Sequence, residues 1–556
     1  MAIFAQLARH PLATAVSAVL VVLFLIRRRP HRLDRAAIKA GLVVPPRAPA
    51  PFPFIGNLIA MGIHPGHFII RGHKKYGDVF STTVMQHNFV FVTGKSHIMR
   101  VTSAPERQLS LNEAYKDLFG FIVGTEIFVP VSKSVFSALT SSRVEAMTPA
   151  LMHVTQRYLE NKFKGDMGKV DMQLLINELV AVLSVSLICG GDFGLEYGPE
   201  VADNMNILET DYSVFSALSP FETAVVRRRR AARLRIMALV EAQARKRVEK
   251  LRDQPMKPTD DYFDRLVHVM FYGRVDKTID ETSIANEFAD NDKPEGEVDP
   301  RDIPEEERIY NIVISAFGLI YGAHTNTSVS AMAHLCEILP RPEYMDILRK
   351  DFVDHLGNDA ITSFKAYLTR VNATPRGQPK EVSPFVQMRT TNRILSESLR
   401  VHLDGGMLRK ALEDVHLDNG VTIPKGSFVI INAYPILASP RLYGADGETW
   451  NPNRLIKPIP PGEFDESSTG GFSGKLDDLQ SPLVRSSDLQ MSGFGSGRHL
   501  CPGRFHAYRM INQMTAQMLV NFDFVVESNF DKWWPVPYGG TARPLGKFIV
   551  FWKRRV

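Results

Sequence analysis

Cysteine is scarce in this chain, which has three cysteines among 556 residues: Cys189, Cys336 and Cys501. An odd number at such wide spacings, with no Cys-x-x-Cys pair, implies neither a disulfide framework nor a zinc site and favours a reducing compartment. The sequence also lacks a Gly-x-Gly-x-x-Gly fingerprint after a predicted strand, so it contains no evident flavin or nicotinamide domain. A redox function would therefore depend on electrons from a partner.

No single sign of charge dominates the composition. Lysine and arginine number 66, aspartate and glutamate number 60, the net charge is +6, and 44% of the residues are hydrophobic. These values are close to those of globular proteins and argue against wholesale disorder. The largest run of cations lies in residues 223–252. Such a run is typical of a solvated helix face or of a helix on anionic lipid, and no nucleic-acid-binding motif accompanies it.

The N-terminus contains an apolar segment without charge, residues 11–26, and a cluster of arginines follows it in residues 27–32. A cleaved signal peptide would carry its cations before the apolar run. The observed order instead predicts a single membrane anchor in residues 1–30, with the rest of the chain in the cytosol. A basic and proline-rich hinge (residues 31–53) and one globular domain (residues 54–556) would follow.

Cys501 lies in the most informative segment, which reads FGSGRHLCPGR from residue 494 to residue 504. Its glycines allow the backbone to fold tightly around one sulfur, and Pro502 fits the first turn of a helix. We expect backbone N–H groups and the helix N-terminus to lower the pKa of the thiol and to make the sulfur a donor to iron. An isolated cysteine in such a turn would more often be a buried free thiol.

The segment resembles the cysteine loop of the haem-thiolate cytochrome P450 family, whose pattern is Phe-x-x-Gly-x-Arg/His-x-Cys-x-Gly. Five residues fall on its fixed positions: Phe494, Gly497, His499, Cys501 and Gly503. The resemblance implies a mainly α fold with small β-sheets, in which residues 54–556 form the catalytic domain. It also implies that Cys501 is the axial ligand of a haem b iron and that Phe494 and Gly503 belong to the haem pocket. Thiolate ligation favours cleavage of the O–O bond.

Residues 309–336 contain no lysine, arginine, aspartate or glutamate, yet polar residues gather at their centre. The segment reads as a buried core helix or as a helix that faces a reaction cavity. Members of the resembled family carry Gly-x-Asp/Glu-Thr here, with the threonine beside the oxygen site. Thr325 matches that threonine, and His324 replaces the acid as in sterol 14-demethylases. A shift of one residue would put Asn326 in this place, as in cholesterol 7-hydroxylases and prostacyclin synthases.

Glu397 and Arg400 lie three residues apart on a predicted helix. Alone, such a pair is commonly a weak surface salt bridge. The resembled family joins a Glu-x-x-Arg pair to an arginine from a Pro-x-Arg-Phe segment, and this triad supports the cysteine loop. Arg454 matches that arginine, so the resemblance implies a structural triad of Glu397, Arg400 and Arg454.

Two haem propionates need cations, and the resemblance places three candidates by position: Arg409, His499 and Arg498. Arg409 could otherwise be a solvent-facing residue of a strand. The Trp-x-x-x-Arg motif that often supplies a further propionate contact is missing from residues 100–150.

The resemblance implies a monooxygenase that inserts one oxygen atom from O2 into a lipophilic substrate. Its electrons would come from NADPH through a P450 reductase, with cytochrome b5 as a second donor, at the endoplasmic-reticulum membrane. A sterol, steroid or terpenoid is the expected substrate. Two alternatives stay open: a haem-thiolate isomerase or dehydratase that needs no reductant, and a non-catalytic haem-binding sensor or carrier.

Overall fold

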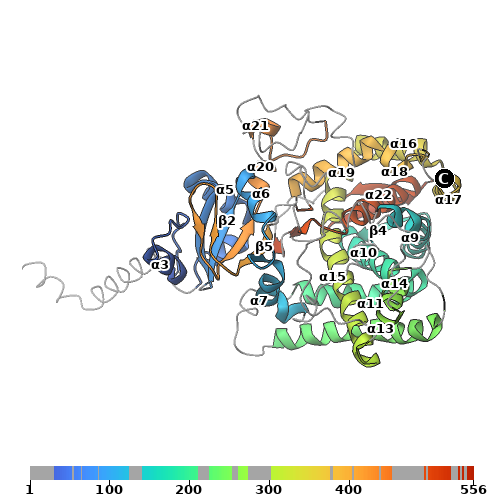
Figure 1. Cartoon of the computed structure of the whole chain (residues 1–556). Helices are drawn as coiled ribbons and strands as arrows, with labels where there is room; N and C mark the ends of the chain where they lie inside the picture. Colours follow the sequence, from blue (N-terminus) through green and yellow to red (C-terminus); the bar gives the residue numbers. More distant parts are fainter. Residues whose placement is uncertain are drawn as a thin grey trace, which may run out of the picture. The chain divides into compact units, whose positions relative to one another are not determined.

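The computed structural model is mainly helical with small β-sheets and divides into two compact units (Figure 1). It describes residues 31–52, 55–63, 65–85, 87–123, 139, 141–210, 224–252, 254, 261–272, 302–375, 378, 380–402, 406–437, 440–453, 494–495, 499–527, 536–538, 541–543 and 547–555. The first unit comprises residues 1–115, 404–438 and 535–540, and the second comprises the rest of the chain. The predicted anchor in residues 1–30 lies outside the described residues.

The first unit is built on a five-stranded sheet with the strand order β1-β2-β8-β5-β3. Its strands are β1 (Val79–Val84), β2 (His87–Val92), β3 (Leu109–Ser110), β5 (Met407–Ala411) and β8 (Phe428–Ile431). Strands β1 and β2 pair antiparallel. Phe80 and Phe91 are direct cross-strand partners whose rings stack 4.9 Å apart, a pairing that stabilises sheets.

Within the residues that the structure describes, five further helices and three short strands lie entirely in the first unit. They are α3 (Arg32–Lys39), α4 (Leu58–Ile63), α5 (Pro65–Tyr76), α6 (Lys95–Thr102), α20 (Tyr434–Leu437), β6 (Val415–His416), β7 (Thr422–Ile423) and β10 (Val536–Tyr538).

A buried ion pair holds the predicted hinge to the sheet of the first unit. Asp34 in α3 accepts a hydrogen bond of 2.7 Å from Arg47 and one of 3.0 Å from Asn88 in β2. Arg47 also donates to Thr83 in β1. Helix α3 is therefore fixed to the sheet of the first unit.

The second unit contains most of the helices. They are α9 (Ser141–Lys162), α10 (Met172–Cys189), α11 (Gly191–Thr210), α13 (Ala224–Leu251), α14 (Tyr262–Tyr272), α15 (Glu305–Ile338), α16 (Pro342–Leu356), α17 (Ala360–Ala373), α18 (Pro384–Gln387), α19 (Arg389–His402), α21 (Pro440–Tyr443) and α22 (Arg504–Asn521). Helix α7 (Leu111–Val123) begins in the first unit and ends in the second. The strands β4 (Met167–Asp171), β12 (Ile549–Arg554) and β9 (Phe522–Val526) form an antiparallel sheet in this order, and β11 spans Thr541–Arg543.

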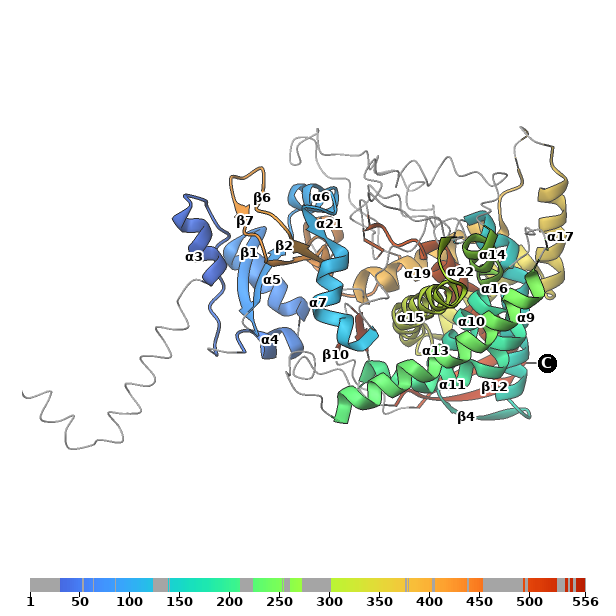
Figure 2. The same ribbon diagram turned by 60° about the horizontal axis from the view of Figure 1, so that its bottom comes forward.

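The long apolar segment in residues 309–336 forms most of α15, which runs through the middle of the second unit (Figures 1 and 2). It packs against α10, α13, α14, α19 and α22. Glu305, Glu306 and Glu307 occupy its first turn, where negative charge favours the helix N-terminus. Among the described residues, only α10 is long and apolar enough to cross a membrane, and 78% of that stretch is buried in the protein. Both apolar helices are therefore core helices.

The basic run in residues 223–252 forms α13, and many of its cations pair with acids of the protein. Arg247 donates to Asp261 at 2.8 Å, and Arg245 donates to Glu241 at 2.8 Å and to Glu306 at 2.7 Å. These pairs fit the reading of α13 as a solvated helix face along its C-terminal half.

We expect His334 to make the protein sensitive to acid. His334 is buried in α15, its Nδ1 lies 3.1 Å from Ser398 Oγ in α19, and burial lowers its pKa to about 3. The unfolded imidazole takes up a proton near pH 6.5, so the stabilisation by neutral His334 is complete above that pH and is lost as the pH falls toward 3. In His334→Leu, the melting temperature should therefore fall less between about pH 7.5 and about pH 5 than in the unaltered chain.

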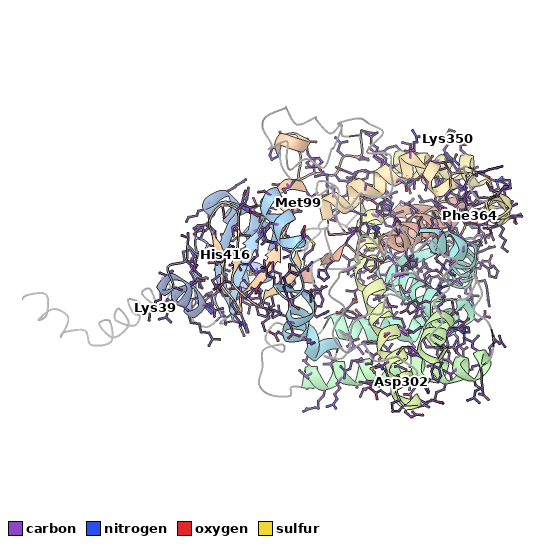
Figure 3. All side chains as sticks on the ribbon, viewed as in Figure 1. Lys39, Met99, Asp302, Lys350, Phe364 and His416 are labelled. Carbon is purple, nitrogen blue, oxygen red and sulfur yellow. The ribbon has the colours of Figure 1, made fainter. Side chains whose placement is uncertain are left out.

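A suitable control is His416→Gln, because His416 is exposed on β6 and is labelled in Figure 3. This control should keep the acid sensitivity of the unaltered chain. If the melting temperature of His334→Leu fell with pH as much as that of the unaltered chain, His334 would not be a source of the acid sensitivity.

Candidate active site

Cys501 lies in a tight loop that is closed by a backbone hydrogen bond. The Cys501 N–H donates to the carbonyl of Phe494 at 2.9 Å, and Gly495 has a φ of +79°, which favours glycine. The ring of Phe494 packs 5.5 Å from the ring of Tyr508 in α22, and the Tyr508 hydroxyl lies 2.9 Å from Ser396 Oγ in α19. The loop is thus attached to both helices. Sequence reasoning did not identify Tyr508 or Ser396, because neither belongs to a local motif.

The thiol of Cys501 is half-buried, and its surroundings correct two expectations. Helix α22 begins at Arg504 with Gly503 as its N-cap, so Pro502 precedes the helix and does not occupy its first turn. Burial raises the pKa of Cys501, although the backbone N–H groups of Gly503 and Arg504 and the charge of Arg504 act to lower it. A bound metal ion deprotonates a coordinating thiol outright, so the thiolate would depend on the metal.

The surroundings of Cys501 suit a flat macrocycle better than a bare metal ion. In the described part of the chain, no group of three or more His, Cys, Asp or Glu side chains could hold a metal ion. Iron on the Cys501 sulfur would therefore take its other ligands from a macrocycle. A Cβ added to Gly503 would meet the Cys501 sulfur at 3.9 Å, so glycine keeps the space beside the sulfur clear.

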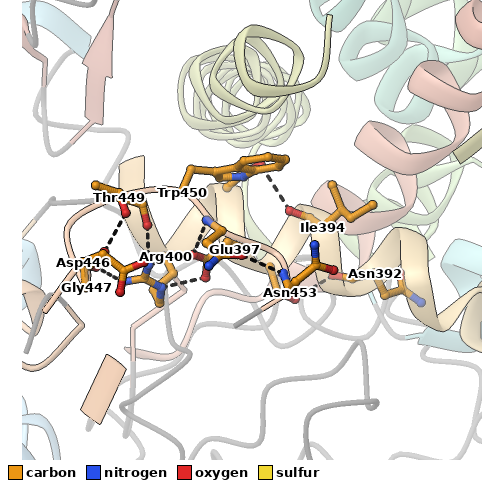
Figure 4. A network of polar contacts seen from close by, with 12 residues as sticks. Asn392, Ile394, Glu397, Arg400, Asp446, Gly447, Thr449, Trp450 and Asn453 are labelled. Carbon is orange, nitrogen blue, oxygen red and sulfur yellow. Dashed lines mark hydrogen bonds and ion pairs between the residues drawn. The ribbon is translucent and has the colours of Figure 1, made fainter. Parts of the chain in front are cut away.

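Glu397 and Arg400 form a buried ion pair in α19 (Figure 4). Arg400 donates to both carboxylate oxygens of Glu397 at 2.8 Å, and it also donates to the carbonyls of Gly447 at 2.6 Å and Thr449 at 3.2 Å. Glu397 in turn accepts from the N–H of Asn451 at 2.9 Å. The pair therefore binds the segment of residues 447–451 to α19. Arg454, the predicted third member of the triad, lies outside the described residues.

His324 and Thr325 of α15 meet a buried carboxylate from another helix. The Thr325 hydroxyl donates to Glu209 Oε1 in α11 at 2.6 Å, and His324 Nδ1 lies 3.3 Å from the same oxygen. His324 Nε2 lies 3.2 Å from the carbonyl of Asn177 in α10, and burial lowers the pKa of His324 to about 4. Sequence reasoning missed Glu209, because nothing local distinguishes this glutamate from a surface acid.

Gly322 and Asn326 are exposed on one side of α15, which we call the open stripe. The other residues from 324 to 335 are buried. The two residues are four positions apart and therefore share one face of the helix. A Cβ added to Gly322 would meet no atom within 4 Å. The Ser330 hydroxyl donates to the carbonyl of Asn326 at 2.8 Å, so it forms a hydrogen bond within its own helix. The polar centre of α15 thus has a buried side with Thr325 and an open side with Asn326.

The structure describes two of the three predicted propionate ligands, Arg409 and His499. Arg409 in β5 is buried, and its Nη1 donates to the carbonyl of Leu408 at 2.7 Å. Its Nη2 is buried and meets no acceptor within the described ranges, and burial lowers the pKa of Arg409 to about 10. Arg409 is therefore not a solvent-facing residue, and its remaining N–H groups suit an anion. His499 is half-buried two residues before Cys501, and Arg498 lies outside the described residues.

A lone soft donor in a loop that Tyr508 and Ser396 attach to α22 and α19 is the arrangement expected of a haem-thiolate protein. The family model of cytochrome P450 matches residues 46–538, so the chain belongs to the cytochrome P450 family. It is accordingly a haem-dependent monooxygenase, and its electrons come from NADPH through a redox partner.

Individual relatives are distant but match along almost the whole chain. Lanosterol 14-alpha demethylase of Cunninghamella elegans is 23% identical over 94% of this chain and 94% of its own length. Ferruginol synthase of Salvia miltiorrhiza is 23% identical over 87% of this chain and 88% of its own length. Retinoic acid-bound cyanobacterial CYP120A1, a solved structure, superimposes with a TM-score of 0.61 at 16% identity, over 92% of this chain and 100% of that one. This likeness confirms the expected fold.

We expect Arg400→Met to destabilise the protein far more than the loss of an exposed ion pair. The substitution removes two charge-assisted hydrogen bonds from the buried carboxylate of Glu397 and leaves two carbonyls without their donor. Breaking a buried pair costs about 3–5 kcal/mol. Denaturant unfolding and the retained haem content would measure the effect.

The matched control is Arg370→Met, because Arg370 pairs with Glu381 at 2.8 Å in an exposed position. Such a pair contributes about 0–1 kcal/mol. Similar losses of stability in the two variants would show that the α19 pair is not a structural support.

Proposed function

We propose that this monooxygenase inserts one oxygen atom into a sterol, steroid or terpenoid, with Cys501 as the axial thiolate ligand of haem b. The observation that supports this proposal most is the hydrogen bond from the Cys501 N–H, three residues before α22 begins, to the carbonyl of Phe494. The substrate class is supported by the relatives, among which are a lanosterol demethylase and a ferruginol synthase. When bound, haem supplies iron-centred activation of dioxygen.

The residues that would hold the haem come from several elements. Phe494 and Gly503 would lie beside the macrocycle, and His499, Arg498 and Arg409 would neutralise its propionates. Arg409 is the best supported of the three cations, because its buried Nη2 has no acceptor among the described residues. Arg454 would complete the buried pair of Glu397 and Arg400. A P450 reductase would deliver the electrons, with cytochrome b5 as a second donor.

Asn326, and not Thr325, would take the position beside the oxygen site. The Thr325 hydroxyl is engaged by Glu209 on the buried side of α15, whereas Asn326 is exposed on the stripe that contains Gly322. The carboxamide of Asn326 can donate and accept hydrogen bonds, so it can orient a water molecule or a substrate hydroxyl. His324 would then help to hold α15 in place and would not contact the substrate.

The chain would be anchored in the endoplasmic-reticulum membrane by residues 1–30, with residues 54–556 in the cytosol. Helix α3 follows the anchor directly, and its exposed side carries Arg32, Arg35 and Lys39 together with Ile38, which is 50% exposed. Such a side suits the interface of an anionic membrane.

The axial assignment predicts that Cys501→Ser abolishes two properties together. The ferrous protein with carbon monoxide should lose the red-shifted Soret band of a thiolate ligand, and product formation should stop. Microsomes that contain the chain, a reductase and NADPH would be supplied with a panel of sterols and terpenoids, and the products would be identified by mass spectrometry. The control is Cys336→Ala, a buried cysteine of α15, which should keep both properties.

The same assay separates the alternative functions. Product formation without NADPH and reductase would support an isomerase or dehydratase. Spectral shifts on ligand binding without any product would support a sensor or carrier. A thiolate band in Cys501→Ser would overturn the assignment of the ligand.

Membrane attachment can be tested by removing residues 1–30. The full chain should stay in the membrane fraction after alkaline carbonate washing, and the shortened chain should be released from it. Residual binding of the shortened chain to anionic vesicles should weaken in Ile38→Asp. It should persist in Val525→Asp, a control at a 66% exposed position on β9. Retention of the shortened chain after carbonate washing would contradict an anchor in residues 1–30.

A further inference from the structure

A buried carboxylate connects three helices around the polar centre of α15. The Glu209 side chain, in the last turn of α11, is 0% exposed, as is that of His324. Glu209 Oε1 accepts from Thr325 at 2.6 Å and lies 3.3 Å from His324 Nδ1. His324 Nε2 contacts the carbonyl of Asn177 in α10 at 3.2 Å. Helices α10, α11 and α15 are therefore joined by side chains at one level of α15.

The hydrogen-bond roles in this cluster follow from what each atom can do. A carbonyl oxygen only accepts, so the Asn177 contact requires a proton on His324 Nε2. The contact between His324 Nδ1 and Glu209 Oε1 is then a hydrogen bond only if a further proton lies between these two atoms. A buried carboxyl that shares a proton and accepts from a hydroxyl forms strong hydrogen bonds, because no water competes for them. The cluster can thus hold α15 firmly.

The rotation of α15 decides which side chain faces its open stripe. Successive residues of an α-helix are turned by about 100° around the axis. Holding Thr325 against α11 therefore turns Asn326 to another side, where it is exposed together with Gly322. A turn of α15 by one residue would bring Thr325 toward the open side.

We propose that Glu209 is a positioning residue that, through Thr325 and His324, fixes the rotation of α15 and thereby presents Asn326 on the open stripe. This inference rests on the proposed function, which places Asn326 beside the oxygen site. Glu209 acts through its contacts with Thr325 and His324 in this arrangement. It selects which of two adjacent polar residues, Thr325 or Asn326, is available there.

The test uses the haem-loaded full chain and a readout other than turnover. The stretching band of carbon monoxide on ferrous haem responds to polar groups beside it, so Asn326→Leu should shift this band. Glu209→Leu should shift or broaden the band as well, because α15 is no longer held. The shift in the double variant should differ from the sum of the two single shifts, since both substitutions change which polar side chain faces the open stripe.

Two further variants separate positioning from a general loss of structure. Glu209→Gln can place its amide nitrogen at the position of Oε1, where its two N–H groups can donate to His324 Nδ1 and to the Thr325 hydroxyl, so it should keep the band of the unaltered chain. Glu200→Leu, on an exposed position of the same helix that pairs with Arg235, should also leave the band unchanged. If Glu209→Leu does not fold, Thr325→Val takes its place, because it removes only the hydroxyl that Glu209 accepts from.

The outcomes distinguish the two proposals. An unchanged band in Glu209→Leu or its substitute, together with a shifted band in Asn326→Leu, would overturn the positioning role of Glu209. A shift in the double variant equal to the sum of the two single shifts would also overturn it. An unchanged band in Asn326→Leu would instead overturn the placement of Asn326, and a missing thiolate band in the unaltered chain would overturn the proposed function itself.

Discussion

The buried ion pair of Glu397 and Arg400 is the interaction on which the rest of the second unit depends. The pair itself binds residues 447–451, and residues beside it on α19 reach two other helices. Ser398 contacts His334 of α15, and Ser396 contacts Tyr508 of α22, whose ring packs on the loop of Cys501. Residues 396–400 of α19 thereby connect the cysteine loop and the central helix.

Polar groups in an apolar core are costly unless their hydrogen bonds are complete. Two buried carboxyl groups of the second unit have partners of different kinds. The carboxylate in α19 is paired with a guanidinium that also satisfies two carbonyls, so its charge is balanced locally. The carboxyl of Glu209 has a hydroxyl and an imidazole as partners, which gives a directional contact between helices. The pair of Glu397 and Arg400 suits support of the scaffold, and the contacts of Glu209 suit orientation of α15.

The first unit shows how an N-terminal segment can be fixed to a folded domain. Asp34 and Arg47 hold α3 to the sheet through Asn88 and Thr83. The same unit contains Arg409, a buried cation with an N–H group that has no acceptor among the described residues. At 23% identity, the relatives share the cytochrome P450 family with this chain.

Much of the fold and the core of the candidate site follow from the sequence alone. The glycines around Cys501 and the Glu-x-x-Arg spacing in α19 are local patterns, because each depends on residues a few positions apart. Tertiary structure decided the rest. Glu209 lies far from Thr325 in the sequence, and the start of α22, the burial of Arg409 and the side of α15 that bears Asn326 depend on long-range packing. A helical pattern determines which residues share a face, but only the neighbouring helices determine which face is buried.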